Sequence, residues 1–409
     1  MILSADGRSY VSTPSGETLW RWIGWAFAAY WVLFASSALT GQRELNTVGG
    51  ILVLAVLAWG VLERLWVKVD VVVLASLAAM FIPLVNVFGN ALQTREAIFK
   101  YESLCAVMAM SRLMRLPLAS GLKLRWLLAI PVLIVLLISI LVDRGDAGDA
   151  TRGAGLFVNP NNLALIPFLL LFLIDERRDP LAIRLGVHAI VIAVLVFSGT
   201  SGAMLAYAVG MAIYMGARLS PRLRVLALTI ALVGGSAAVA LIVVDGGNLL
   251  PETRLTKQLS LMRSEFQIVL QGGRVAYYDQ ERMLGTGATS AVWRLDHWRR
   301  TITMYIDGSP AEQFFGFGTG SAEVLLPKLP HNEYLRILFE QGFAGFLLFF
   351  VAWRTILKTA PASIRYIGII VAIYSFSENN IDNFPFMSLF ILFLSASELG
   401  RRPDLRNIQ

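Results

Sequence analysis

The segment PHNEYLRILFEQGFAGFLLFF, residues 330–350, changes from polar to apolar within the length of one helix. It places an imidazole, an amide and a carboxylate, from His331, Asn332 and Glu333, where a polar loop meets an apolar run. Ionisable groups at the edge of a bilayer are costly to maintain and usually have a function. The segment therefore predicts a membrane-spanning helix from Tyr334 to Ile356 that begins beside a reaction site.

The composition extends the membrane assignment to most of the chain. Of 409 residues, 56% are hydrophobic and 15% are charged, and the mean hydropathy is +0.64. Soluble domains carry about 25% charged residues, so we expect an all-α polytopic membrane protein in contact with the lipid bilayer. The net charge of +7 lies mainly in short loops, which argues against nucleic acid as a partner. The single cysteine, Cys105, excludes an intrachain disulfide.

Runs of about 20 apolar residues predict about twelve transmembrane helices. The expected spans are 20–40, 48–65, 69–89, 97–116, 124–142, 156–174, 183–197, 203–217, 225–244, 334–356, 364–376 and 384–399. They divide the chain into a tail (1–19), spans one to nine (20–244), a large helical loop (245–330), spans ten to twelve (331–400) and a second tail (401–409).

Lys and Arg residues indicate the orientation of these spans. They are concentrated in alternate loops, as at Arg177, Arg178 and Arg184, and are sparse in the loops between. Because cytoplasmic loops are rich in Lys and Arg, we expect both termini in the cytoplasm. The 245–330 loop is then extracytoplasmic.

Two helices are expected in the 245–330 loop, with the chemistry on the second. The first carries an apolar stripe from Leu255 to Val269, and the second covers residues 291–305. Arg294 and Trp298 lie one turn apart there, and Arg299 follows. A guanidinium binds phosphate oxygens with two parallel hydrogen bonds, so these side chains are candidates for binding a phosphate and a sugar. A solvated basic helix face is the alternative.

His331 is the candidate catalytic base. An imidazole titrates near neutrality, which suits the removal of a proton from a hydroxyl. Asn332 adjoins it, and Arg336 and Glu340, one turn or more along the helix, either pair with each other or reach the same cavity. A purely structural histidine at the membrane interface is the alternative.

A second polar group lies at the start of the sixth expected span, in Asn159-Pro160-Asn161-Asn162. Such a sequence serves either as a helix cap or, with Asn161 and Arg152, as a polar wall for a sugar or phosphate. The sequence contains no metal-binding motif, Asp-x-Asp pair or phosphate loop, so neither a metal nor another cofactor is expected. The substrate would then be a donor already activated in the membrane.

Together these segments resemble the O-antigen ligase family and its related polysaccharide polymerases. The motifs that carry the resemblance are Gly155 with Asn159-Pro160-Asn161, Ser198-Gly199-Thr200-Ser201-Gly202, Arg294-x-x-x-Trp298, Gly316-x-Gly318-x-Gly320, and His331-Asn332-x-Tyr334-Leu335 followed by Glu340-x-Gly342-x-x-Gly345. They fall within residues 150–400, and the block that begins at His331 is the most specific of them.

The resemblance implies a metal-independent, inverting glycosyltransferase of lipopolysaccharide biosynthesis in the bacterial inner membrane. The donor would be a glycan on undecaprenyl pyrophosphate, and the acceptor a hydroxyl of a glycan or lipid core on the periplasmic side. His331 matches the histidine that activates the acceptor, and Arg294 matches the arginine that binds pyrophosphate. Many relatives carry another arginine where this chain has Ser201-Gly202; Arg152, Arg299 or Arg336 is the expected substitute. A polysaccharide polymerase and a precursor transporter or flippase are the alternative functions.

Overall fold

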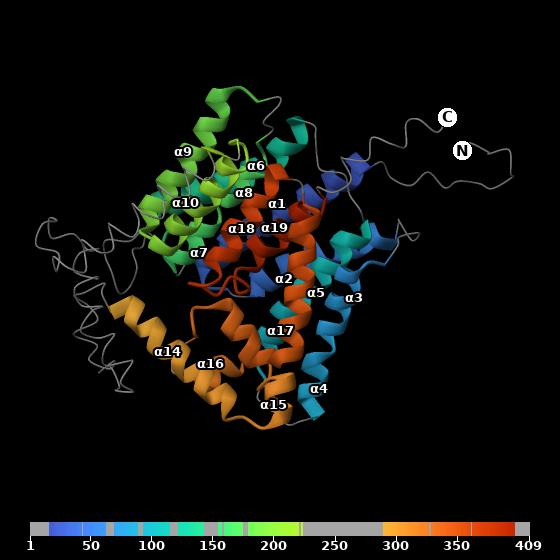
Figure 1. Cartoon of the computed structure of the whole chain (residues 1–409). Coiled ribbons are helices and arrows are strands. Elements are labelled where there is room, and N and C mark those ends of the chain that lie inside the picture. The colour runs from blue at the N-terminus through green and yellow to red at the C-terminus, as the bar shows by residue number, and fades with distance from the viewer. Residues whose placement is uncertain are drawn as a thin grey trace, which may run out of the picture.

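The computed structural model describes residues 16–42, 44–62, 69–88, 93–114, 122–142, 154–157, 159–174, 179–220, 222–223, 289–326, 329–360 and 362–396. Within these ranges the regular elements are helices (Figure 1). They are α1 (Gly16–Thr40), α2 (Glu44–Leu62), α3 (Val71–Met80), α4 (Ile82–Phe88), α5 (Arg95–Met114), α6 (Leu122–Leu141), α7 (Pro160–Leu165), α8 (Phe168–Leu171), α9 (Leu181–Ser198), α10 (Ser201–Gly216), α14 (Thr289–Ile306), α15 (Pro310–Phe315), α16 (Ser321–Leu325), α17 (Glu333–Thr359), α18 (Ala362–Tyr374) and α19 (Phe384–Ala396).

The lengths and compositions of these helices fit a membrane protein that crosses the bilayer several times. Four described helices are long and apolar enough to span a membrane, namely Thr18–Thr40, Glu44–Leu62, Leu181–Ser198 and Glu333–Thr359. Shorter apolar helices accompany them, including Ser201–Gly216 and Phe384–Ser395. The all-helical prediction is confirmed, whereas the count of twelve spans stays a prediction. The ninth expected span and the helix expected at 255–269 lie outside the described residues.

The sixth expected span is not one continuous helix, and in this respect the prediction was wrong. Residues 160–171 form two short helices, α7 and α8. Backbone hydrogen bonds there join residues three apart, as from Ile166 N to Leu163 O (3.2 Å) and from Leu170 N to Pro167 O (3.0 Å). Pro167 has no N–H to donate to the preceding turn. The chain therefore tightens at this point and does not continue as a regular α-helix.

A large apolar core joins the helices across the bundle. Trp20, Phe172, Trp353 and Phe390 are among its buried aromatic side chains, and α19 contacts α1, α5, α8, α17 and α18. Many apolar side chains on the outer helix faces are exposed, such as Leu141 at 74%. An apolar core with an apolar exterior fits a helix bundle surrounded by lipid.

The predicted helix at 291–305 is present as α14 and belongs to a small unit with α15 and α16. Figure 1 shows α14 running obliquely beside α16 toward α15 and the end of α17 that lies near α4. All three helices contact α17. Asn86, at the end of α4, donates a hydrogen bond from Nδ2 to Phe315 O (3.0 Å), which fastens the unit to the spans.

A glycine-rich loop holds the unit of α14, α15 and α16 against α17. Gly316 (φ 88°) and Gly342 (φ 66°) both have positive φ, and Gly342 interrupts α17. A Cβ at Gly342 would lie only 2.4 Å from Gly316 N. The Phe339 and Glu340 carbonyls of α17 instead accept hydrogen bonds from Phe317 N (2.9 Å) and Gly318 N (3.1 Å). The Gly316-x-Gly318-x-Gly320 motif thus forms a turn against α17, ahead of the segment that leads to His331.

Candidate functional site

His331 lies directly before α17 in a backbone conformation that few residues other than glycine adopt. Its φ is +46°, the one positive φ of a non-glycine residue within the described part of the chain. Contacts on both sides hold it there. Pro330 O accepts a hydrogen bond from Trp298 Nε1 (2.7 Å), and Glu333 N donates to Ser375 O (2.8 Å). A strained residue held on both sides is a common feature of functional sites.

The His331 ring contacts a buried carboxylate. Its Nδ1 lies 2.9 Å from Glu378 Oε1, and the His331 side chain is 23% exposed while that of Glu378 is 4% exposed. The other carboxylate oxygen of Glu378 accepts a hydrogen bond from Asn161 Nδ2. Thr200 Oγ1 donates to Asn161 Oδ1 (3.3 Å). A chain of polar side chains therefore runs from a partly exposed imidazole into the bundle.

The helix-cap interpretation of the Asn159-Pro160-Asn161 sequence is confirmed for Asn159, whereas the polar wall for a sugar or phosphate stays a prediction. Asn159 caps α7, because its side chain accepts a hydrogen bond from Asn161 N (2.9 Å). The Asn161 side chain points instead to Glu378. The Asn161 carbonyl accepts from Tyr374 Oη (3.0 Å), so this turn is fixed to the end of α18.

Residues 375–383, between α18 and α19, connect the segments that form the site. They read Ser-Phe-Ser-Glu-Asn-Asn-Ile-Asp-Asn. Ile381 N donates to Glu333 Oε2 (2.8 Å), and Asn383 Nδ2 donates to Asn162 O (3.2 Å). This one segment therefore joins the starts of α7 and α17. Asn332 adds a cap to α17, since its side chain accepts from Leu335 N (3.1 Å).

Arg336 and Glu340 pair with each other in a buried ionic cluster. Arg336 Nε lies 3.1 Å from Glu340 Oε1, and its Nη1 lies 2.6 Å from Asp382 Oδ2. Lys100 Nζ lies 3.9 Å from Asp382 Oδ1. Burial disfavours the Asp382 carboxylate, but the opposite charges of Arg336 and Lys100 outweigh burial and hold the pKa of Asp382 below its usual range. Asp382 follows Glu378 by four residues, so the cluster adjoins the His331 site.

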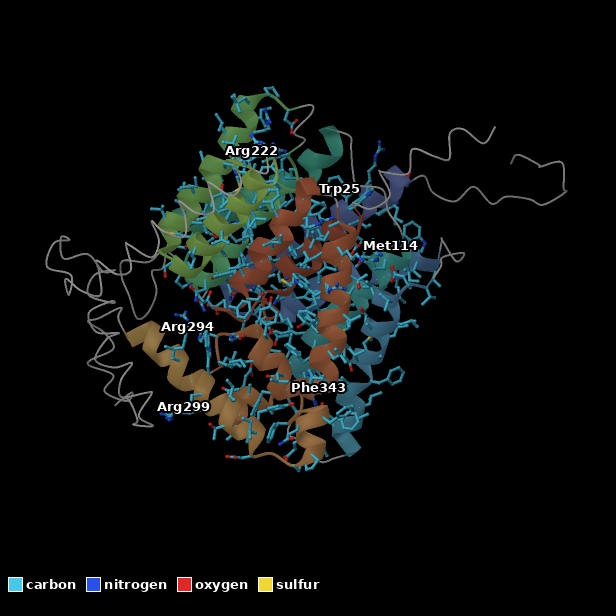
Figure 2. The ribbon with its side chains drawn as sticks, viewed as in Figure 1. Trp25, Met114, Arg222, Arg294, Arg299 and Phe343 are labelled. Atoms are coloured by element: carbon cyan, nitrogen blue, oxygen red, sulfur yellow. The ribbon has the colours of Figure 1, made fainter. Side chains whose placement is uncertain are left out.

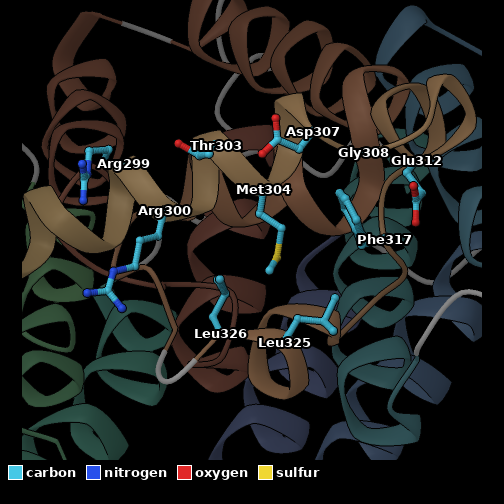
Figure 3. A pocket seen from close by; sticks show the side chains of 10 residues that line it. All are labelled: Arg299, Arg300, Thr303, Met304, Asp307, Gly308, Glu312, Phe317, Leu325 and Leu326. Carbon is cyan, nitrogen blue, oxygen red and sulfur yellow. The ribbon is translucent and has the colours of Figure 1, made fainter. Parts of the chain in front are cut away.

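Trp298 connects α14 to the His331 segment through its bond to Pro330. Arg294 lies one turn earlier on the same helix, where Figure 2 labels it on α14, and its role in the site stays a prediction. Arg299 lies at one end of the lining of a cavity of about 750 Å³ beside α14 (Figure 3). Arg152 lies outside the described residues.

The structure thus brings His331, Asn161 and Asn332 together. Trp298 donates a hydrogen bond to Pro330, the residue before His331. It adds Glu378 and Asp382, which the sequence interpretation missed, and Thr200, which the sequence interpretation had only as part of a family motif. The sequence feature that could have indicated Glu378 is a polar run between two apolar helices. Nothing in that run shows which of its carboxylates contacts the histidine. Among the residues that the structure describes, no group of three or more His, Cys, Asp or Glu side chains is placed to hold a metal ion.

These features define a multi-pass helical membrane protein with a histidine–carboxylate pair at the head of one candidate span. Residues 186–350 match a protein family described as O-antigen ligase, so the chain contains a domain of that family. The matched region includes α10, α14 and His331, together with most of α9 and most of α17. A search of curated proteins gives no match. The family consists of ligase- and polymerase-type membrane enzymes that transfer glycans in surface polysaccharide biosynthesis.

Proposed function

We propose that this protein transfers a glycan from undecaprenyl pyrophosphate to the hydroxyl of an acceptor sugar at the periplasmic face of the bacterial inner membrane. The observation that carries the proposal is the 2.9 Å contact between His331 Nδ1 and Glu378 Oε1 in the family domain and its adjoining segment. A base oriented by a buried carboxylate is suited to activating a hydroxyl.

The Glu378 contact sets the roles of the two ring nitrogens. A hydrogen bond from Nδ1–H to Glu378 fixes the tautomer in which Nε2 carries the lone pair. Nε2 then takes the proton of the acceptor hydroxyl as its oxygen bonds to the anomeric carbon. The carboxylate stabilises the imidazolium that forms, as in other catalytic histidine–carboxylate pairs.

The bond between the anomeric carbon and the pyrophosphate oxygen breaks as the new glycosidic bond forms. Attack from the face opposite the leaving group inverts the anomeric configuration, and undecaprenyl pyrophosphate departs. Its developing negative charge requires cations, and Arg294, one turn from Trp298 on α14, is the proposed pyrophosphate ligand. Such donors stabilise the transition state more than the ground state. Arg336 already binds Glu340 and Asp382, so we assign it to positioning α17 against residues 375–383.

Consumption of the donor tests this function. The purified protein in proteoliposomes, given a lipid-linked oligosaccharide and an acceptor glycan, should release undecaprenyl pyrophosphate and form the coupled glycan. Movement of the intact donor across the bilayer without cleavage would indicate a transporter instead. In a deletion strain, full-length lipid-linked chains would indicate a lost ligase, whereas short capped chains would indicate a lost polymerase.

The proposed orientation has its own test. Ile302 on α14 is 41% exposed, and Cys105 is the single native cysteine. An Ile302→Cys substitution in a Cys105→Ser background should react with a membrane-impermeant maleimide in intact spheroplasts. Labelling that requires permeabilised membranes would place α14 in the cytoplasm and contradict the proposal.

A further inference from the structure

The cavity beside α14 is a mixed charged and apolar groove that the transfer mechanism does not use. Its lining includes Arg299, Arg300, Thr303 and Met304 from α14 and Asp307, which directly follows that helix. Residues 300, 303, 304 and 307 recur at helical spacing and share one face. Figure 3 shows Met304 directed into the groove, with Leu325 and Leu326 across from it.

The wall opposite α14 is closely packed. Phe317 stacks on Phe339 of α17, with ring centroids 4.6 Å apart and planes 8° apart. Leu326 belongs with Phe339 to a small buried cluster. Gly308 closes one end, where an added Cβ would lie 2.7 Å from the Phe317 ring. The groove is therefore shaped by packed side chains, and its volume of about 750 Å³ is within the range of small-ligand sites.

Charge changes sign along the groove. Arg299 and Arg300 lie toward one end, and Asp307 and Glu312 lie toward the other (Figure 3). Asp307 follows Arg299 by eight positions, which at helical spacing is a rise of about 12 Å. Glu312 accepts hydrogen bonds from Ser309 N and Ser309 Oγ, both at 2.7 Å, in a capping box that fixes the start of α15. Those bonds lower the pKa of Glu312 and keep it ionised.

We propose that this groove binds an acidic saccharide, the part of the acceptor glycan that carries a phosphate or carboxylate substituent. Guanidinium groups match such anions with paired hydrogen bonds. Phe317, Met304 and Leu325 supply apolar surface for the C–H faces of sugar rings, and Asp307 accepts hydrogen bonds from sugar hydroxyls. The assignment to the acceptor rests on the proposed function.

The relation of the groove to His331 supports this assignment. Trp298 bonds to Pro330, the residue before His331, and Arg299 and Arg300 follow Trp298 directly. Arg294 and Trp298, four residues apart, share a different face of α14 from residues 300, 303, 304 and 307. The helix α14 thus carries the proposed pyrophosphate ligand, Arg294, on one face and the groove residues on another. Its middle turn contacts the His331 segment through Trp298.

The proposal is tested by binding, without turnover, in the His331→Ala protein in phosphatidylcholine nanodiscs. The probes are a fluorescent glucosamine disaccharide with one phosphate and the same disaccharide without it. We expect the phosphorylated probe to bind about tenfold more tightly, and the Arg299→Ala/Arg300→Ala variant to lose that preference. The matched control is Arg218→Ala/Arg222→Ala. This control removes the same charge near the end of α10, where Figure 2 places Arg222 far from Arg299, and should keep the preference.

A second variant tests the groove without changing its charge. Thr303 is exposed on α14 and lines the groove, so Thr303→Trp should fill it and weaken binding of both probes about tenfold. Equal affinity for the two probes, or an unchanged preference in the double arginine variant, contradicts the proposal. Displacement of the phosphorylated probe by phosphatidylglycerol in the nanodisc would assign the groove to lipid headgroups instead. None of these outcomes depends on glycan transfer, so the groove proposal and the proposed function fail separately.

Discussion

The His331 imidazole and the Glu378 carboxylate lie 2.9 Å apart although 47 residues separate them in the sequence. One belongs to the strained turn before α17 and the other to the polar segment between α18 and α19. The bond between Asn161 and the second oxygen of Glu378 fixes the carboxylate. Three distant parts of the chain therefore converge to orient one ring.

Replacing Glu378 by Gln keeps the shape of the side chain and removes its charge. We expect kcat for glycan transfer to fall by about 10²–10⁴-fold, because a general base that loses its orienting carboxylate loses most of its catalytic effect. KM for the donor should change little. Steady-state kinetics in proteoliposomes across pH 5–9 measures both parameters.

Glu378→Asp is the control for this variant because it retains a carboxylate and should recover part of the rate. A Gln variant with the wild-type kcat would show that Glu378 does not position His331.

Arg336 joins α17 to the 375–383 segment through a buried ion pair with Asp382. Arg336→Met leaves Asp382 and Glu340 without their main partner, and breaking a buried pair costs about 3–5 kcal/mol. We expect a clearly lower Tm in detergent for this variant. Arg222→Met, at an exposed arginine near the end of α10, should leave Tm unchanged. Equal Tm values for both variants would contradict the stabilising role of the cluster.

The low pKa of Asp382 makes a second prediction, on acid stability. Its folded pKa lies below its usual value, so the unfolded state binds the proton more readily. The resulting stabilisation is fully present above the usual aspartate pKa and is lost as pH falls through the depressed folded pKa. In Asp382→Asn the decline of Tm toward acidic pH should be shallower than in wild type. Parallel Tm curves for the two proteins would be inconsistent with this prediction.

Trp298 holds the turn before His331 through its hydrogen bond to Pro330. Trp298→Phe removes this bond, which is worth about 0.5–1.5 kcal/mol, and retains an aromatic ring. We expect kcat to fall several-fold and amide hydrogen exchange to increase in residues 329–332. Trp22→Phe is the control, because Trp22 is 52% exposed on α1. Exchange rates in Trp298→Phe that equal those of the control would show that the bond does not restrain the turn.

Gly342 allows the close approach of the glycine-rich loop to α17. Gly342→Ala introduces a Cβ about 2.4 Å from Gly316 N and also strains a residue with φ 66°. We expect a loss of stability of about 1–3 kcal/mol and faster proteolysis between α14 and α16. Gly216→Ala on α10 meets no atom within 4 Å and should have little effect. The account of the loop would be wrong if the two variants were equally stable.

Much of the helical architecture was predictable because apolar runs of fixed length leave few alternatives in a bilayer. The helices α9, α10, α14 and α17 begin and end within one to three residues of the predicted limits at every end. The sixth span was predicted as continuous because hydrophobicity alone does not show where a chain tightens, as it does at Pro167.

For the site, the sequence located His331 by its position at the head of an apolar helix. It did not identify Glu378, because the pairing depends on how α17, α18 and α19 pack. Residues 375–383 contain two carboxylates, Glu378 and Asp382, of which one meets His331 and the other meets Arg336. Only the tertiary arrangement distinguishes their roles. Arg299 was predicted to bind substrate, and the structure adds that it lines a groove shared with Arg300.

The central claim is that His331 activates the acceptor hydroxyl, and the most direct measurement is the single-turnover rate of glycan transfer from a lipid-linked donor by His331→Ala. The donor and acceptor are both saturating, and the folded state of the variant is confirmed by its Tm. Removal of a general base lowers the rate by about 10²–10⁴-fold, so we predict a loss of that size with donor binding retained. A folded His331→Ala protein that transfers glycan at the wild-type rate would contradict the account.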